Sequence, residues 1–71
     1  MFIELSHNNN IVYKGSMKQH AYEISKLIND NPDDAYILKI LKPTRVKKKM
    51  KLVKEITNVC DIAELCLYNL L

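Results

Sequence analysis

The sequence predicts one small α+β domain with the element order ββαββα, in which an antiparallel sheet carries two helices packed on one face. Three observations predict this fold. Short β-favouring stretches open the chain and recur in its second half, each pair joined by turn-forming residues. Two longer stretches place apolar residues at helical spacing. The chain has 71 residues with one glycine and two prolines, and a chain of this length forms a single core, so we expect one domain over residues 1–71.

The first hairpin is predicted from residues 2–6 and 10–15. Residues 2–6 alternate loosely between apolar and polar side chains, and residues 11–13 are β-branched or aromatic. Between the two stretches, residues 7–10 (His-Asn-Asn-Asn) tolerate left-handed backbone and favour a turn. Gly15 is expected to close the second strand.

The first helix is predicted to begin after Ser16. Ser16 and Gln19 match the Ser-x-x-Gln capping box, in which the N-cap hydroxyl accepts a hydrogen bond from the amide three residues on. Residues 29–32 (Asn-Asp-Asn-Pro) are expected to end the helix. Its apolar face is formed by Met17, Ala21, Ile24, Leu27 and Ile28.

The second hairpin is predicted from residues 35–41 and about 46–54. Residues 35–41 are apolar, β-favouring and short for a helix. Residues 42–45 (Lys-Pro-Thr-Arg) suit a type I turn with proline at its second position. The spacing within 46–54 fits a helix as well as a strand. We favour the strand, because a helix would bring several like-charged lysines into neighbouring positions.

The last helix is predicted to be capped by Thr57 or Asn58 and to run to about residue 70. Asp61 and Glu64 lie in its early turns, where they favour the positive end of the helix dipole. Its core stripe is expected to be Val59, Ile62, Ala63, Cys66 and Leu70. Three leucines lie largely outside that stripe and predict a protein interface, for example a homodimer seam: Leu65, Leu67 and Leu71.

Positive charge is concentrated in one segment. The formal net charge of the chain is +3, yet residues 1–38 hold three lysines against five acidic residues, and residues 55–71 hold three acidic residues and no lysine or arginine. Residues 39–54 carry eight cations and no acidic residue: Lys39, Lys42, Arg45, Lys47, Lys48, Lys49, Lys51 and Lys54. Such an asymmetry bears on the partners of a protein rather than on its fold.

The basic segment predicts a binding module that docks the 39–54 hairpin on nucleic-acid phosphates, because cations gain affinity there by releasing counterions. Seven of the eight cations are lysines. Lysine is a point charge without the bidentate fork of arginine, so backbone contacts and modest sequence preference are expected. The alternative is an inhibitor or adaptor, of the type encoded by mobile elements. It would bind an acidic protein with the same cations, or an apolar surface with the C-terminal leucines.

Two further interpretations of the lysines have less support. A lysine-rich strand also prevents aggregation at a sheet edge, but that purpose rarely requires eight cations without an acid. A peripheral membrane binder needs apolar anchors beside its lysines, and only Met50 and Leu52 are in place for that role.

Catalysis, metals and cofactors are not expected. His7 falls in a turn and His20 on the exposed side of the first helix, with no nucleophile placed beside either by spacing. The aspartates near residue 30 lack the glycine and glutamate of a calcium loop. Cys60 and Cys66 lie six residues apart, so on a helix they point to different sides and can neither pair nor share a metal. They are expected to be free buried thiols. With no signal peptide and no transmembrane segment predicted, we expect a cytoplasmic, reducing setting.

Overall fold

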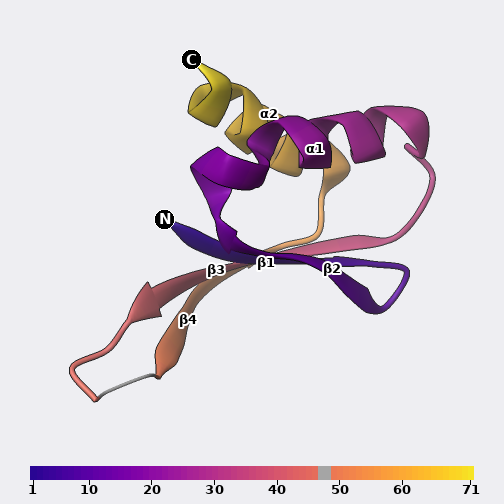
Figure 1. Cartoon of the computed structure of the whole chain (residues 1–71). Helices are drawn as coiled ribbons and strands as arrows, with labels where there is room; N and C mark the ends of the chain where they lie inside the picture. The colour runs from indigo at the N-terminus through magenta and orange to yellow at the C-terminus, as the bar shows by residue number, and fades with distance from the viewer. Residues whose placement is uncertain (47–48) are drawn as a thin grey trace.

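The computed structural model describes residues 1–46 and 49–71 and confirms the predicted element order (Figure 1). The strands are β1 (Phe2–His7), β2 (Asn10–Ser16), β3 (Tyr36–Pro43) and β4 (Met50–Ile56). The helices are α1 (Met17–Asp30) and α2 (Val59–Leu70). All neighbouring strands are antiparallel, in the sheet order β2-β1-β3-β4, and both helices lie on one side of the sheet.

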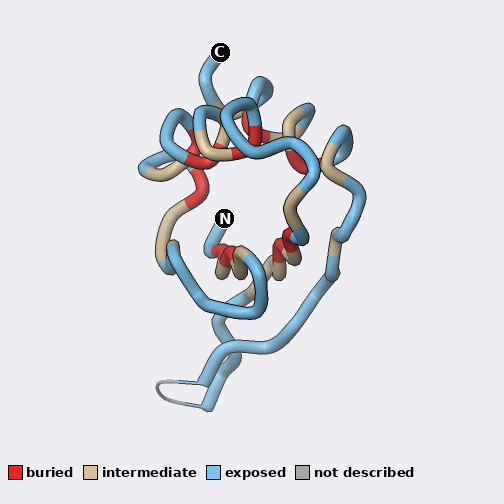
Figure 2. The backbone as a smooth tube through the Cα atoms, turned by 90° about the vertical axis from the view of Figure 1, so that its right-hand side faces the viewer, coloured by how far each residue is buried: buried red, intermediate tan, exposed pale blue. Residues whose placement is uncertain are grey.

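The core lies between the inner face of the sheet and the two helices, as Figure 2 shows. Side chains alternate along a strand, so every second residue of β1 and β3 points toward the helices. Burial on those positions drives the two layers together. The buried residues are Ile3, Leu5, Tyr36 and Leu38 from the sheet, Met17, Ala21, Ile24 and Ile28 from α1, and Ile62 and Cys66 from α2.

Helix α1 begins where predicted, but without the predicted capping box. Ser16 occupies the N-cap position with extended backbone, and its side chain makes no capping hydrogen bond. The Met17 amide donates to the backbone carbonyl of Met1 instead, at 2.9 Å. Met1 immediately precedes β1, the strand that pairs with β2, so the acceptor lies far from α1 in the sequence. Local residue spacing does not reveal such a contact.

The turn between β1 and β2 has the backbone that its asparagines predict. Asn8 and Asn9 have φ angles of 51° and 70°, in the left-handed region that asparagine tolerates. Further along β2, Gly15 has a φ of 144°, and a Cβ there would lie 3.2 Å from Nε2 of His20. His20 is therefore half-buried over Gly15 and tilted against Tyr13, which corrects the expected exposed position.

The second hairpin turns later than predicted. Strand β3 continues through Pro43, which pairs with Met50, so the type I turn expected at residues 42–45 is wrong. Pro43 lies beyond the last pair of β3 with β1, where its missing N–H costs no hydrogen bond to β1. The hydroxyl of Thr44 then donates to the carbonyl of Lys49 at 3.1 Å. Strand β4 begins at residue 50 rather than 46, and residues 47–48 lie outside the described part of the chain.

Helix α2 is capped by Asn58, whose side-chain oxygen accepts from the Asp61 amide at 3.1 Å. The predicted core stripe is partly wrong. Leu70 is exposed and Leu65 packs against the core instead. The last turn of α2 points away from the sheet (Figures 1 and 2), so residues there have no layer to pack against.

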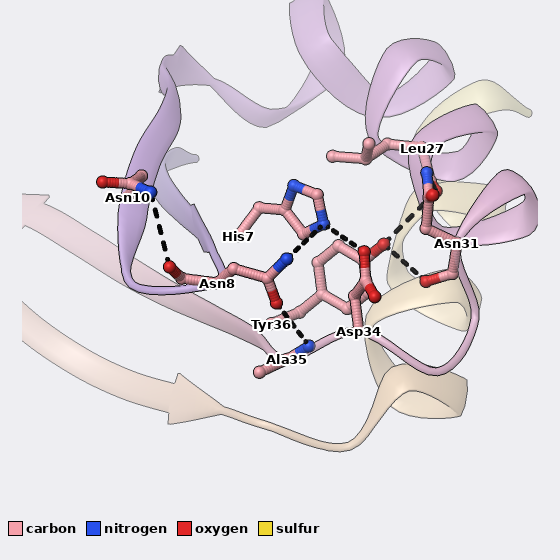
Figure 3. Close-up of polar contacts among 8 residues, drawn as sticks. All are labelled: His7, Asn8, Asn10, Leu27, Asn31, Asp34, Ala35 and Tyr36. Atoms are coloured by element: carbon pink, nitrogen blue, oxygen red, sulfur yellow. Dashed lines mark hydrogen bonds and ion pairs between the residues drawn. The ribbon is translucent and has the colours of Figure 1, made fainter.

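Tyr36 connects three parts of the fold (Figure 3). Its buried ring stacks on His7, with ring centroids 4.9 Å apart. Its hydroxyl donates to the Asn31 carbonyl at 2.7 Å and lies 3.3 Å from the carbonyl of Leu27, at the C-terminal end of α1. Burial, followed by the negative charges of two nearby aspartates, raises the pKa of Tyr36, so the hydroxyl keeps its proton and remains a donor.

A second set of bonds joins the β1–β2 turn to the loop before β3. Nε2 of His7 donates to the Asp34 carboxylate at 2.8 Å. The backbone amide of Asn8 donates to the backbone carbonyl of Ala35 at 2.8 Å. The backbone amide of Ala35 donates in return to the side-chain Oδ1 of Asn8 at 3.1 Å. These contacts join residues 27 positions apart in the chain and hold the ends of β1 and β3 together.

We predict that Tyr36→Phe lowers the free energy of unfolding by about 1–2 kcal/mol, because the Asn31 carbonyl loses the hydrogen bond from the hydroxyl while the ring stays in place. Urea denaturation measured by circular dichroism checks this. Tyr22→Phe is the matched control, since Tyr22 is 65% exposed on α1, the helix whose end the Tyr36 hydroxyl contacts, and it should change stability by less than about 0.5 kcal/mol. Equal effects of the two variants would contradict the role assigned to the Tyr36 hydroxyl.

Candidate nucleic-acid interface

The β3–β4 hairpin extends beyond the rest of the sheet as an arm. The last pair between β1 and β3 is Phe2 with Leu41, and we define the arm as the described residues past that pair, 42–46 and 49–51. All of these residues are exposed. Figure 1 shows the hairpin extending to the lower left, away from the two helices. The arm therefore contributes little to the core.

Four of the predicted site residues come together on this arm. Lys42 and Lys51 face each other directly across the two strands. Like charges in that position destabilise a strand pair, so the fold itself does not favour this arrangement. Arg45 and Lys49 lie nearer the tip, both exposed. Within residues 1–46 and 49–71 the only ion pair within 4.0 Å joins His7 and Asp34, so these four cations have no carboxylate at that distance there.

Two predicted site residues lie at the base of the hairpin, beside acidic groups. Lys39 is half-buried and pairs across the sheet with Glu4 on one side and Glu55 on the other. Lys54 lines an open hollow of ≈ 540 Å³ together with Asp61 and Glu64 of α2. Both lysines thus lie near carboxylates of the domain, although within the described residues neither forms an ion pair within 4.0 Å. The remaining two, Lys47 and Lys48, fall outside the described residues.

The three leucines of the predicted protein interface do not form one surface. Leu65 packs against the core. Leu67 is 59% exposed and Leu71 fully exposed, beside the exposed Tyr68 on the last turn of α2. This apolar end of α2 is separate from the arm: in Figure 1 the last turn of α2 lies at the top of the molecule and the arm at the bottom.

The side chains with catalytic potential are engaged in structural contacts or isolated. His7 is bound by Asp34 and stacked on Tyr36. In the part of the chain that the structure describes, no group of three or more His, Cys, Asp or Glu side chains could hold a metal ion. Sequence reasoning missed the His7–Tyr36 pair, although His7 continues the alternation of Ile3 and Leu5 and so could be placed on the inner face.

The two cysteines differ in their surroundings. Both are free, as predicted, but only Cys66 is buried; the prediction that Cys60 is buried is wrong. Cys60 lies in the first turn of α2, on the side that faces solvent. Cys66 lies on a different side of the helix, against the core. Burial raises the pKa of the Cys66 thiol to about 11, which keeps it in the unreactive neutral form.

Comparison of the chain with protein-family models, with curated proteins and with solved structures finds no match. Neither helix among the described residues has the length and apolar character required to cross a membrane. The arm is therefore interpreted from its own geometry and charge.

We predict that iodoacetamide labels one cysteine of the native protein, Cys60, and labels Cys66 only after unfolding. The buried neutral thiol lacks both access and thiolate character at pH 7 to 8. Peptide mass spectrometry with and without urea measures the two sites separately. Labelling of Cys66 at a rate similar to Cys60 in native conditions would contradict the packing of α2 described above.

Proposed function

We propose that this protein is a small non-catalytic module that binds nucleic-acid phosphates through the β3–β4 arm. The observation that carries the proposal is the pair Lys42 and Lys51, which face each other on an exposed ribbon together with Arg45 and Lys49. Their mutual repulsion is relieved when a polyanion lies against them. Counterion release from the nucleic acid then adds to the affinity.

The shape of the arm supports a duplex as the ligand. The major groove of B-DNA admits a two-stranded antiparallel ribbon, and the arm is such a ribbon with cations on both of its strands. Single-stranded ligands are usually held by exposed aromatic rings. The described arm has no aromatic residue, and Tyr36 is buried in the core at the opposite end of β3. Phosphate contacts by lysine therefore dominate, with modest sequence preference.

The charge of the rest of the chain supports an end-on approach. Residues 1–38 and 55–71 each carry a negative formal charge, whereas residues 39–54 carry eight cations. A polyanion is attracted to the arm and repelled by the body, so the module is oriented with its arm toward the ligand. Lys39 and Lys54 lie near carboxylates of the domain, so they contribute less to this attraction than the cations of the arm.

The test is fluorescence anisotropy with labelled duplex DNA, single-stranded DNA and RNA at about 50 and 200 mM salt. If the arm contacts five or more phosphates, the logarithm of the association constant should fall with the logarithm of the salt concentration at a slope steeper than about −4 on duplex. Absence of binding at the lower salt concentration would overturn the proposal. An acidic protein surface would then be the better candidate for the arm, as in an inhibitor or adaptor.

We predict that Lys49→Gln combined with Lys51→Gln weakens duplex binding about 100-fold at 50 mM salt and makes the salt slope shallower by about 2, because two phosphate contacts are lost. The matched control is Lys18→Gln combined with Lys26→Gln, which removes the same charge from exposed positions of α1. The control should keep the slope and most of the affinity. Equal losses in both double variants would show that net charge, and not the arm, determines binding.

A further inference from the structure

Among residues 1–46 and 49–71, no helix or strand covers the outer face of the sheet, opposite the helices (Figure 1). Directly paired residues of an antiparallel sheet share a face, so the register identifies which side chains lie there. Positions that alternate with the buried core residues of β1 and β3 point outward, and their cross-strand partners on β2 and β4 point the same way.

A charged row crosses the middle of this outer face. Lys14 of β2 pairs with Glu4 of β1, Glu4 pairs with Lys39 of β3, and Lys39 pairs with Glu55 of β4. The charges thus alternate across all four strands in the order positive, negative, positive, negative. Such cross-strand pairs stabilise the sheet itself. Read from β4 to β2, the order of the charges is negative, positive, negative, positive, so each position has the opposite sign to the same position read from β2 to β4.

Apolar side chains lie on both sides of the charged row. On the side of the arm, Phe2, Leu41 and Leu52 form a continuous row across β1, β3 and β4. On the other side, Ser6 pairs with Ile11 of β2 and with Ile37 of β3. Phe2 is 46% exposed, Leu52 48% and Ile11 59%, so the outer face presents considerable apolar surface to solvent.

We propose that this face binds a second copy of the chain, face to face, about a two-fold axis that runs parallel to the strands between β1 and β3. A two-fold interface requires a surface that complements itself, and such an axis reverses the charged row. Lys14 then faces Glu55 of the second copy, and Glu4 faces Lys39 of the second copy. By symmetry, the four residues of the row form four interchain pairs of opposite charge.

The apolar rows agree with the same axis. Reversal places Phe2 against Leu41 of the second copy, and Leu41 against its Phe2, so the largest exposed side chain of the face meets an aliphatic partner. Two sheets packed in this way form a sandwich about 10 Å apart, flanked by helices on both outer sides. A chain of 71 residues has only one small core, and oligomerisation is a common way to stabilise domains of this size.

The dimer is inferred from the sheet alone and does not rest on the proposed function. It does have a consequence for the arms. Because the axis runs parallel to the strands, it leaves the strand direction unchanged, so both arms project from the same end of the dimer. Two basic arms side by side would bind a polyanion as a bivalent unit.

The experiment uses charge reversal on the row and measures mass by sedimentation equilibrium without nucleic acid. Lys39→Glu alone, or Glu4→Lys alone, creates two interchain pairs of like charge, and each should weaken dimerisation about 100-fold or more relative to the unchanged chain. An equimolar mixture of the two variants restores opposite charges at all four pairs. The mixture should therefore form a one-to-one heterodimer, although each variant alone is monomeric at the same concentration.

Controls separate this interface from folding and from net charge. Lys18→Glu, on the exposed face of α1, makes the same change in charge as Lys39→Glu and should leave dimerisation unchanged. The double variant Glu4→Lys with Lys39→Glu keeps the row self-complementary and should dimerise, with circular dichroism confirming that each variant is folded. A monomeric unchanged chain at millimolar concentration, or a mixture that stays monomeric, would overturn the proposal. If the unchanged chain is monomeric at that concentration and still binds nucleic acid, the dimer is overturned and the proposed function stands.

Discussion

The one-sided core is the constraint on which the rest of this structure depends. Ten side chains of the described residues are buried, all of them between the inner face of the sheet and the two helices. A chain of 71 residues supplies no further layer. The outer face of the sheet and the β3–β4 arm are consequently free of any packing role in the core. The core therefore does not constrain which residues stand on these two surfaces, and both are free to contact other molecules.

The polar contacts around Tyr36 complete that core at the end opposite the arm. His7, Asn8 and Asp34 join the β1–β2 turn to the loop before β3, and the Tyr36 hydroxyl donates to the Asn31 carbonyl at the end of α1. Among the described residues, no buried side-chain nitrogen or oxygen atom lacks a hydrogen-bond partner. The ends of three elements are thereby fixed, while the opposite end of the sheet remains open as the base of the arm.

The sequence predicted the six elements because local periodicity and turn residues determine them. Pro43 shows why element ends were less predictable: its effect depends on whether a neighbouring strand needs its N–H, and β1 has already ended there. Leu65 and Leu70 exchanged roles because the last turn of α2 points away from the sheet, which leaves Leu70 exposed while Leu65 packs against the core. The charged row was not foreseen, since it follows from strand register. Register here includes irregularities between Leu5 and Ser6 and between Ile40 and Leu41 that no local pattern specifies.

The position of the arm along the chain affects how the fold is completed. Helix α2 contributes Ile62 and Cys66 to the core, yet it follows the arm and must return to α1 from a distant part of the chain. Pairing of β3 with β4 places Ile56 opposite Leu38, so the hairpin brings the start of the connection to α2 back beside the body of the sheet. The conformational entropy of that return is then limited to the short connection between β4 and α2. The pairing of β3 with β4 thus also shortens the path by which the last helix reaches its place.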